Sequence, residues 1–203
     1  MSSVSETFVR EFFELHGFLV RQQRKYVGKT RKAADDIDFI VLNPQPDKDK
    51  DKEPLPFVLS SSDLAKIVRA VVVVKGWHTE SFSPSVLANA PGIFKFVQPK
   101  AFKQTADIFG DDESIERILV VPALPKDKEV RQESIELLKS SGIDGILSFS
   151  TILSTLIDRI ETNRNYQKSD LLQVIRVMKN YGFFRENQLE LFQAKKRRSQ
   201  GNA

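Results

Sequence analysis

The chain of 203 residues contains no cysteine, and it has only two histidines and one tryptophan. Without cysteine it can form neither disulfides nor thiolate metal sites. The two histidines, His16 and His78, stand far apart in the sequence, so a histidine-rich zinc site is not expected. Any metal ion is therefore expected to be a hard cation that carboxylates hold.

Long apolar runs are missing as well. No run approaches the ~20 residues that span a membrane, and the N-terminal residues lack the basic-then-apolar order of a signal peptide. The composition, 40% hydrophobic and 29% charged, is typical of a soluble globular protein. We therefore expect a cytoplasmic protein with no membrane partner. The net charge of +4 permits an anionic partner without demanding one.

Short apolar runs, several of them rich in β-branched residues, predict the strands of a central sheet. Five strands are expected, at Phe18–Val20, Ile37–Leu42, Ala70–Val74, Ile118–Val121 and Gly145–Phe149. The runs are apolar without regular alternation, so both faces of the sheet are expected to be covered.

Apolar residues at helical spacing predict helices between and around these strands. The expected helices are Phe8–His16, Leu64–Val68, Lys128–Lys139, Ile152–Ile160 and Asp170–Lys179. Gly17 is expected to end the first helix and Ser169 to cap the last one. The predicted fold class is α/β, with a mixed central sheet flanked by helices.

The predicted organisation has one domain and two appendages. Residues 1–162 form the α/β domain, and residues 163–190 form a C-terminal helical extension packed on it. Packing of this extension on a second subunit is an open alternative, which would make the protein a homodimer. Residues 191–203 carry the basic run Lys195–Arg198 and are expected to be a disordered tail.

Two charged residues interrupt the apolar strands, Asp38 inside one and Lys75 at the end of another. A carboxylate in a buried strand costs several kcal/mol unless it is paired or coordinated. One interpretation is a structural ion pair or two exposed strand ends. The other is a site in which the acid holds a divalent cation and the lysine steadies water or a phosphate.

The order of these features resembles the PD-(D/E)XK nuclease superfamily, the restriction-endonuclease-like fold. Its pattern is a helix with a glutamate, a strand, a strand with an aspartate, a strand ending in (D/E)-x-K, then a helix and further strands. The resemblance covers roughly residues 5–160. It implies that Asp38 and Glu6 hold Mg²⁺ or Mn²⁺, and that Lys75 stabilises charge on the phosphate and orients water. Asp38, Lys75 and Glu6 are then the catalytic residues.

The sequence departs from this pattern at one position. Two places before the lysine, where the pattern has an acidic residue, this sequence has Val73. Glu80, which is close in sequence, is the first candidate to supply the missing metal ligand, and Glu11, Asp35 and Asp36 are other candidate substitutes. Glu6 has a second interpretation, because Ser3 and Glu6 have the spacing of a helix capping box.

A basic segment and an aromatic pair are the candidates for nucleic-acid contacts. A basic loop that follows the nucleic-acid backbone gives binding that weakens steeply with salt, although solvated loops are also often basic. A tryptophan can stack on a base or belong to the core, and a histidine can contact phosphate or lie on the surface. The predicted contact residues are Arg21, Arg24, Lys25, Lys29, Trp77 and His78.

The leading functional prediction is Mg²⁺-dependent phosphodiester hydrolysis of DNA or RNA. The alternative is a catalytically inactive module of the same fold that binds nucleic acid or protein, and Val73 favours it. A third hypothesis is a protein-interaction domain with no role on nucleic acid.

Overall fold

A computed structural model describes residues 3–23, 37–47, 54–99, 109 and 115–184. The chain separates into two compact units, Met1–Leu156 and Ile157–Ala203. The first unit contains the sheet and the second is helical where it is described. The predicted α/β class with a mixed central sheet is confirmed.

The sheet follows the order of the chain. The strands β1 to β3 are antiparallel neighbours, and β3, β4 and β5 run parallel to one another. All five predicted strands form, with bounds shifted by a few residues: β1 Leu19–Gln22, β2 Phe39–Leu42, β3 Arg69–Val74, β4 Glu116–Val121 and β5 Gly145–Ser148.

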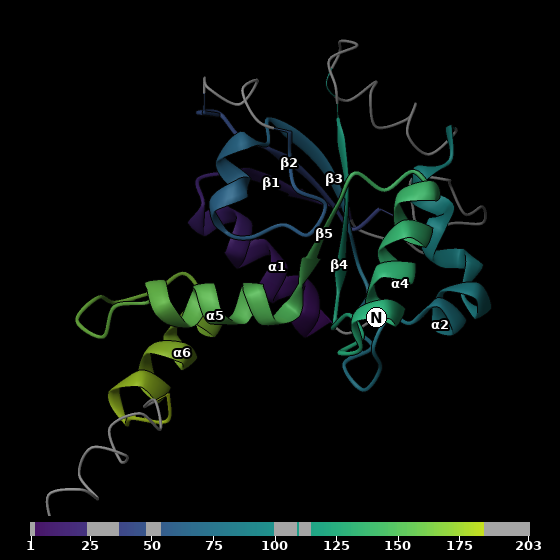
Figure 1. Ribbon diagram of the computed structural model, residues 1–203. Helices are drawn as coiled ribbons and strands as arrows, with labels where there is room; N and C mark the ends of the chain where they lie inside the picture. The colour runs from purple at the N-terminus through teal and green to yellow at the C-terminus, as the bar shows by residue number, and fades with distance from the viewer. Residues whose placement is uncertain (1–2, 24–36, 48–53, 100–108, 110–114, 185–203) are drawn as a thin grey trace, which may run out of the picture. The chain divides into compact units, whose positions relative to one another are not determined.

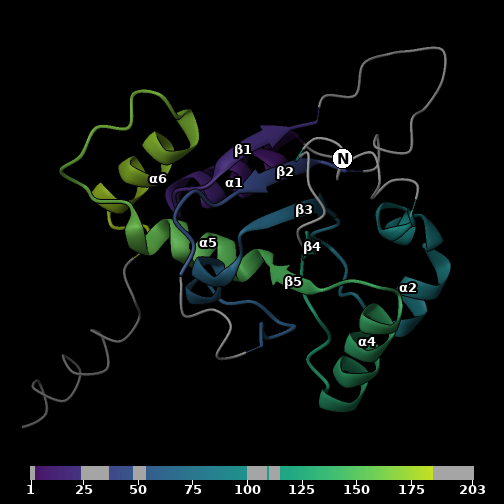
Figure 2. The same cartoon turned by 90° about the horizontal axis from the view of Figure 1, so that it is seen from above.

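Helices cover both faces of this sheet, as its apolar strands require. Figures 1 and 2 show α2 and α4 on one side of the central strands and α1 on the other. Gly17, with φ of +83°, ends α1 in the left-handed conformation that glycine adopts without strain. The elements of this unit besides the strands are α1 Ser3–Leu15, η3 Ser62–Lys66, α2 Pro84–Asn89, η4 Pro91–Val97, α4 Lys128–Ser140 and the start of α5 Phe149–Arg159.

The core between the sheet and α2 and α4 is apolar around Val73. Val73 and Leu119, which pair across β3 and β4, pack in it with Leu87 of α2 and Leu138 of α4. Each of these four side chains is at most 1% exposed. The side of β3 that carries Val73 is therefore closed to solvent along the strand.

A short segment outside the named strands covers the edge of β5. Leu59 N donates to Ile146 O at 2.8 Å, and Ile146 N donates to Phe57 O at 2.8 Å. Gly145 allows the close approach, because a Cβ there would lie 2.9 Å from Leu59 Cδ1. The segment shields backbone groups that would otherwise template pairing with another chain, and no local sequence pattern predicts it.

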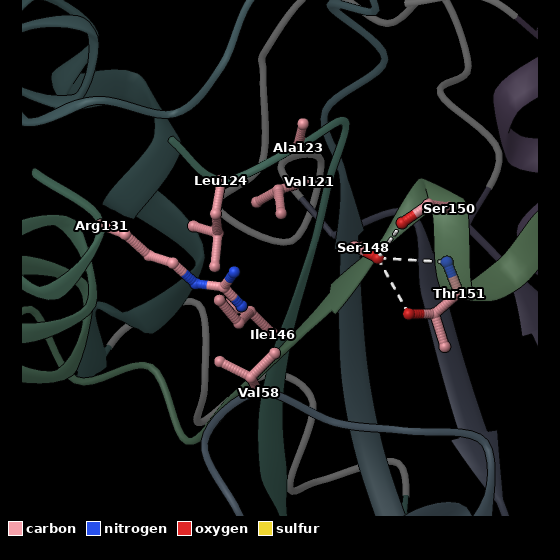
Figure 3. Close-up of a pocket in the computed structure, with 9 residues that line it drawn as sticks. All are labelled: Val58, Val121, Ala123, Leu124, Arg131, Ile146, Ser148, Ser150 and Thr151. Atoms are coloured by element: carbon pink, nitrogen blue, oxygen red, sulfur yellow. Dashed lines mark hydrogen bonds between the residues drawn. The ribbon is translucent and has the colours of Figure 1, made fainter. Parts of the chain in front are cut away.

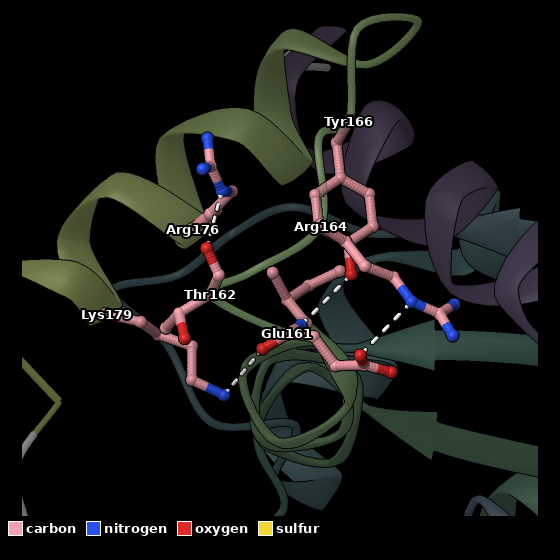
Figure 4. Close-up of polar contacts among 7 residues, drawn as sticks. Glu161, Thr162, Arg164, Tyr166, Arg176 and Lys179 are labelled. Carbon is pink, nitrogen blue, oxygen red and sulfur yellow. Dashed lines mark hydrogen bonds and ion pairs between the residues drawn. The ribbon is translucent and has the colours of Figure 1, made fainter.

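In the second unit, Lys179 of α6 (Asp170–Asn180) satisfies the carbonyl end of α5. Its Nζ donates to Ile157 O at 2.6 Å and to Ile160 O at 2.8 Å. A cation is favoured there because the last carbonyls of a helix lack partners within it. Arg164 pairs with Glu161 at 3.1 Å (Figure 4). No helix in the described part of the chain is long and apolar enough to cross a membrane.

Candidate functional site at the ends of β2 and β3

Asp38 immediately precedes β2 and is only 2% exposed. Its Oδ2 accepts a hydrogen bond from Val74 N at 2.8 Å, while its own N–H donates to Val72 O at 3.1 Å. The regular pairing of β2 with β3 stops one residue later, at Phe39 opposite Val72. The carboxylate thus takes the place of a main-chain acceptor and extends the ladder past its last regular pair.

The side-chain alternation of a strand is interrupted at Asp38. Ile37 and Ile40 both belong to the core under α2 and α4, although they are three residues apart. In a regular strand, residues separated by an odd number lie on opposite faces. The chain is therefore irregular between them, and it is here that the Asp38 side chain turns to the backbone of β3.

Lys75 follows the last residue of β3, and its N–H continues the parallel ladder by donating to Val120 O at 3.0 Å. Its side chain is half-buried. The Asp38 carboxylate binds the neighbouring residue, Val74, so the structure brings the predicted aspartate and lysine together at the same end of two paired strands.

Val73 stands where the resemblance expects the second metal-binding acid. The side chain is 1% exposed and lies in the apolar core with Phe82 and Leu119. A carboxylate in such surroundings is strongly disfavoured unless it is paired. The ligand set that the resemblance implies for Mg²⁺ is therefore incomplete here, and the residues at this position do not fit the ion.

Glu6 lies in the first turn of α1 and is tied to β1. Its Oε2 accepts a hydrogen bond from Gln22 Nε2 at 2.8 Å. The adjacent Ser5, which is 3% exposed, hydrogen-bonds through Oγ to His78 Nε2 at 2.9 Å. The first turn of α1 is thus attached both to β1 and to the loop that follows Lys75. No sequence signal connects Ser5 with a histidine so distant in the chain.

Gly76 leaves the space that this attachment needs. A Cβ at position 76 would lie 2.7 Å from Ser5 Oγ and 3.2 Å from Ser5 Cβ. Gly76→Ala is therefore expected to lower the free energy of unfolding by about 1–2 kcal/mol, because the Ser5–His78 hydrogen bond must break or the loop must shift. Chemical denaturation measures the change.

A double-mutant cycle with Ser5→Ala isolates this clash. In the Ser5→Ala background the alanine at position 76 is expected to cost less, because the nearest atom is gone. Equal costs in the two backgrounds would show that the serine hydroxyl does not set the requirement for glycine. Gly92→Ala is the matched control, since a Cβ there would have no neighbour within 4 Å.

The rings of Trp77 and His78 each pack against a buried phenylalanine. The Trp77 ring stacks on the buried Phe82, with centroids 5.7 Å apart and planes at 30°, and the residue is 38% exposed. The His78 ring meets Phe149 edge-on at 4.5 Å. Both residues remain accessible to a ligand, and their predicted contacts with nucleic acid stay predictions.

Those of the substitute acidic residues that the structure describes, Glu11 and Glu80, form no metal-binding group with Asp38. Glu80 lies exposed in the loop after Lys75, and Glu11 is 5% exposed and paired with Arg10 at 3.1 Å. Across the described ranges, no three histidine, aspartate or glutamate side chains are grouped so that they could hold a metal ion. Asp35 and Asp36 lie outside those ranges.

Glu14 lies one turn after Glu11 on α1, and its surroundings shift the pKa of its carboxyl. Its partial burial raises the pKa of the Glu14 carboxyl above 4.5, the Glu11 charge raises it further, and Arg10 opposes both. The folded state therefore loses stability relative to the unfolded chain as Glu14 ionises. Glu14→Gln is expected to stabilise the protein by less than about 0.5 kcal/mol near neutral pH, since the site is exposed.

The sign of this effect gives the pH dependence. Well below pH 4.5 the wild-type carboxyl is protonated in both states, so the gain from Glu14→Gln is expected to vanish there. Thermal unfolding from about pH 3 to pH 8 measures it, with the exposed Glu133→Gln on α4 as the control. A gain of equal size at all pH values would contradict the electrostatic cause.

Of the predicted nucleic-acid contacts in the basic segment, the structure describes one, Arg21. Arg21 lies exposed in β1. Arg24, Lys25 and Lys29 lie outside the described residues. Their role stays a prediction.

A second feature, a pocket of about 350 Å³, lies at the carboxyl ends of β4 and β5 (Figure 3). Binding sites in open α/β sheets often lie beyond the carboxyl ends of parallel strands, which is the one general signal for it. Sequence reasoning missed the pocket because its wall is assembled from separate segments: Val58, Val121, Ala123, Leu124, Arg131, Ile146, Ser148, Ser150 and Thr151.

Comparison with models of protein families, with curated proteins and with solved structures finds no protein similar to this chain.

Proposed function

We propose that the chain is a nucleic-acid-binding domain on a fold like that of the PD-(D/E)XK nucleases, and that it binds without metal-dependent cleavage. The observation that carries this proposal is the place of Val73. It lies 1% exposed in an apolar core, two residues before Lys75, where the pattern of the family has a metal-binding acidic residue.

The order of the elements supports the fold part of the proposal. The helix with Glu6, the strand β1, the strand preceded by Asp38 and the strand followed by Lys75 come in the order of the resemblance. The helix α2 and the strands β4 and β5 follow, as that order requires. Asp38 and Lys75 also meet at one end of two paired strands.

The charge and the exposed side chains near this end support binding. Lys75 is half-buried, Trp77 presents one side to solvent, and Arg21 is exposed on β1. Cations that contact phosphates give salt-dependent affinity, and an exposed indole ring can stack on a base. The Asp38 carboxylate has a structural role in this proposal, as the acceptor for Val74 N.

Fluorescence anisotropy with labelled single-stranded and double-stranded DNA and RNA tests the proposal. We expect binding in EDTA that weakens steeply between about 50 and 200 mM salt, and no cleavage with Mg²⁺ or Mn²⁺. Arg21→Gln and Lys75→Gln are expected to weaken binding, whereas Lys126→Gln, an exposed lysine before α4, serves as the charge-matched control.

Two results would overturn the proposal. Cleavage by the wild type that requires Mg²⁺ and disappears in Asp38→Asn would establish the nuclease instead. Absence of binding to every nucleic acid would remove the nucleic-acid part and leave the protein-interaction hypothesis.

A further inference from the structure

We infer that the pocket at the carboxyl ends of β4 and β5 binds a phosphate ester of nucleotide size, either a free nucleotide or the phosphorylated terminal nucleotide of a strand. This site is separate from the Asp38 and Lys75 pair, since neither residue lines it. The inference does not depend on the proposed function, because a free nucleotide would satisfy it.

The size and the walls of the pocket suit a small organic molecule. Its volume of about 350 Å³ lies within the range of known small-ligand sites, ~300–1,000 Å³. Aliphatic side chains of Val58, Val121, Leu124 and Ile146 form much of the wall. They can bury a flat or apolar body such as a base, which neither a bare phosphate ion nor a metal ion would require.

Arg131 of α4 supplies a cation at this wall. Figure 3 shows its guanidinium over Ile146, between Leu124 and Val58. None of the ion pairs found among the described residues involves Arg131, and its side chain donates no hydrogen bond within those ranges. A guanidinium available for two parallel hydrogen bonds favours a phosphate or carboxylate ligand.

Hydroxyl groups face the guanidinium across the pocket. Ser148 Oγ lies 2.7 Å from Ser150 Oγ and 2.8 Å from Thr151 Oγ1, and it accepts from Thr151 N at 3.1 Å as the cap of α5. The Ser148 oxygen is thus engaged, whereas Ser150 is exposed and can turn its hydroxyl to a ligand. These donors and Arg131 give the pocket a polar part beside its apolar wall.

The pocket wall has an aliphatic part and a polar, cationic part, and together they indicate the class of ligand. An anion alone would leave the aliphatic wall in contact with water, and an apolar molecule alone would make no use of the guanidinium. A nucleotide has both an anionic group and a planar body, and its size matches the pocket. Of the simple ligand classes, the phosphate ester with an apolar or aromatic body therefore uses the wall most completely.

Calorimetric titration of the full chain with AMP and UMP tests the inference. We expect saturable binding to one site, weaker binding of ribose 5-phosphate, and the weakest binding of adenosine and of inorganic phosphate. Arg131→Gln is expected to weaken AMP binding at least about tenfold. Ala123→Trp, at an exposed wall residue, is expected to abolish it by filling the pocket.

Lys128→Gln is the matched control, because it removes a positive charge from an exposed site on the same helix without touching the wall. Its AMP affinity should equal that of the wild type. If no nucleotide binds at millimolar concentration, or if Arg131→Gln and Lys128→Gln have the same effect, the inference is wrong. Thermal unfolding of each variant without ligand verifies that it is folded.

Short oligonucleotides with and without a 5′-phosphate distinguish the two sources of the ligand. Displacement of AMP only by the phosphorylated form would assign the site to strand ends, and displacement by neither form would assign it to free nucleotides. Nucleic-acid binding that Arg21→Gln weakens and Ala123→Trp leaves intact would support the proposed function even if AMP failed to bind. AMP binding in a chain that binds no nucleic acid would support the nucleotide site and contradict the proposed function.

Discussion

Replacement of Val73 by glutamate is expected to lower the free energy of unfolding by about 3–5 kcal/mol and to produce neither Mg²⁺ binding nor cleavage. The substitution restores the acidic residue of the (D/E)-x-K pattern in the sequence. In the structure, however, the new carboxylate would enter a core whose described members around it, such as Phe82 and Leu119, are apolar. Because domain stabilities are about 5–15 kcal/mol, this is a large part of the total.

The control for this experiment is an equal change on the surface. Val130→Glu on α4 introduces the same side chain at a residue that is 36% exposed, and it should change stability by less than about 0.5 kcal/mol. Urea denaturation measures both variants, and calorimetry with Mg²⁺ tests for a new site. A Val73→Glu protein that gains stability on addition of Mg²⁺ would mean that the core opens to form a metal centre, against the function proposed here.

Asp38→Ala is expected to destabilise the protein by about 2–3 kcal/mol. The change removes the acceptor of Val74 N, and a buried donor left without a partner costs about 1–3 kcal/mol, with a further loss because the acceptor was charged. The effect should appear in the absence of any metal ion. Denaturation in EDTA therefore measures it directly.

Asp38→Asn separates the structural role from a metal-binding role. The amide oxygen can still accept from Val74 N, so stability should fall much less than in Asp38→Ala. A purely structural Asp38 also predicts that Mg²⁺ shifts the melting temperature of the wild type no more than that of Asp38→Asn. A metal-dependent shift confined to the wild type would show that Asp38 is a ligand.

Much of the fold could be predicted from the sequence because the signals are local. Runs such as Ala70–Val74 and Ile118–Val121 are short, apolar and rich in β-branched residues, which favours a buried strand. The mixed sheet followed from their alternation with helices after the third strand. Near the start of α1 at Ser3 the local signal was the capping-box spacing of Ser3 and Glu6, since the apolar repeat begins only at Phe8.

The candidate site was predictable only where its signal is local in the sequence. A charge in an apolar strand is visible in the sequence, so Asp38 and Lys75 could be selected. The partner of the Asp38 carboxylate could not, because it is a main-chain N–H, which every residue except proline carries. The Ser5–His78 hydrogen bond and the Arg131 pocket depend on contacts between distant segments, which no local pattern encodes.

The agreement between strand order in the sheet and in the chain has a consequence for folding. Each new strand docks on the one made just before it, so the sheet can grow in the direction of synthesis. Residues 57–59 are the exception, because their hydrogen-bonding partner Ile146 emerges far later. We expect their docking to be a late event, and until then the outer edge of β5 is the part of the nascent sheet most open to association with other chains.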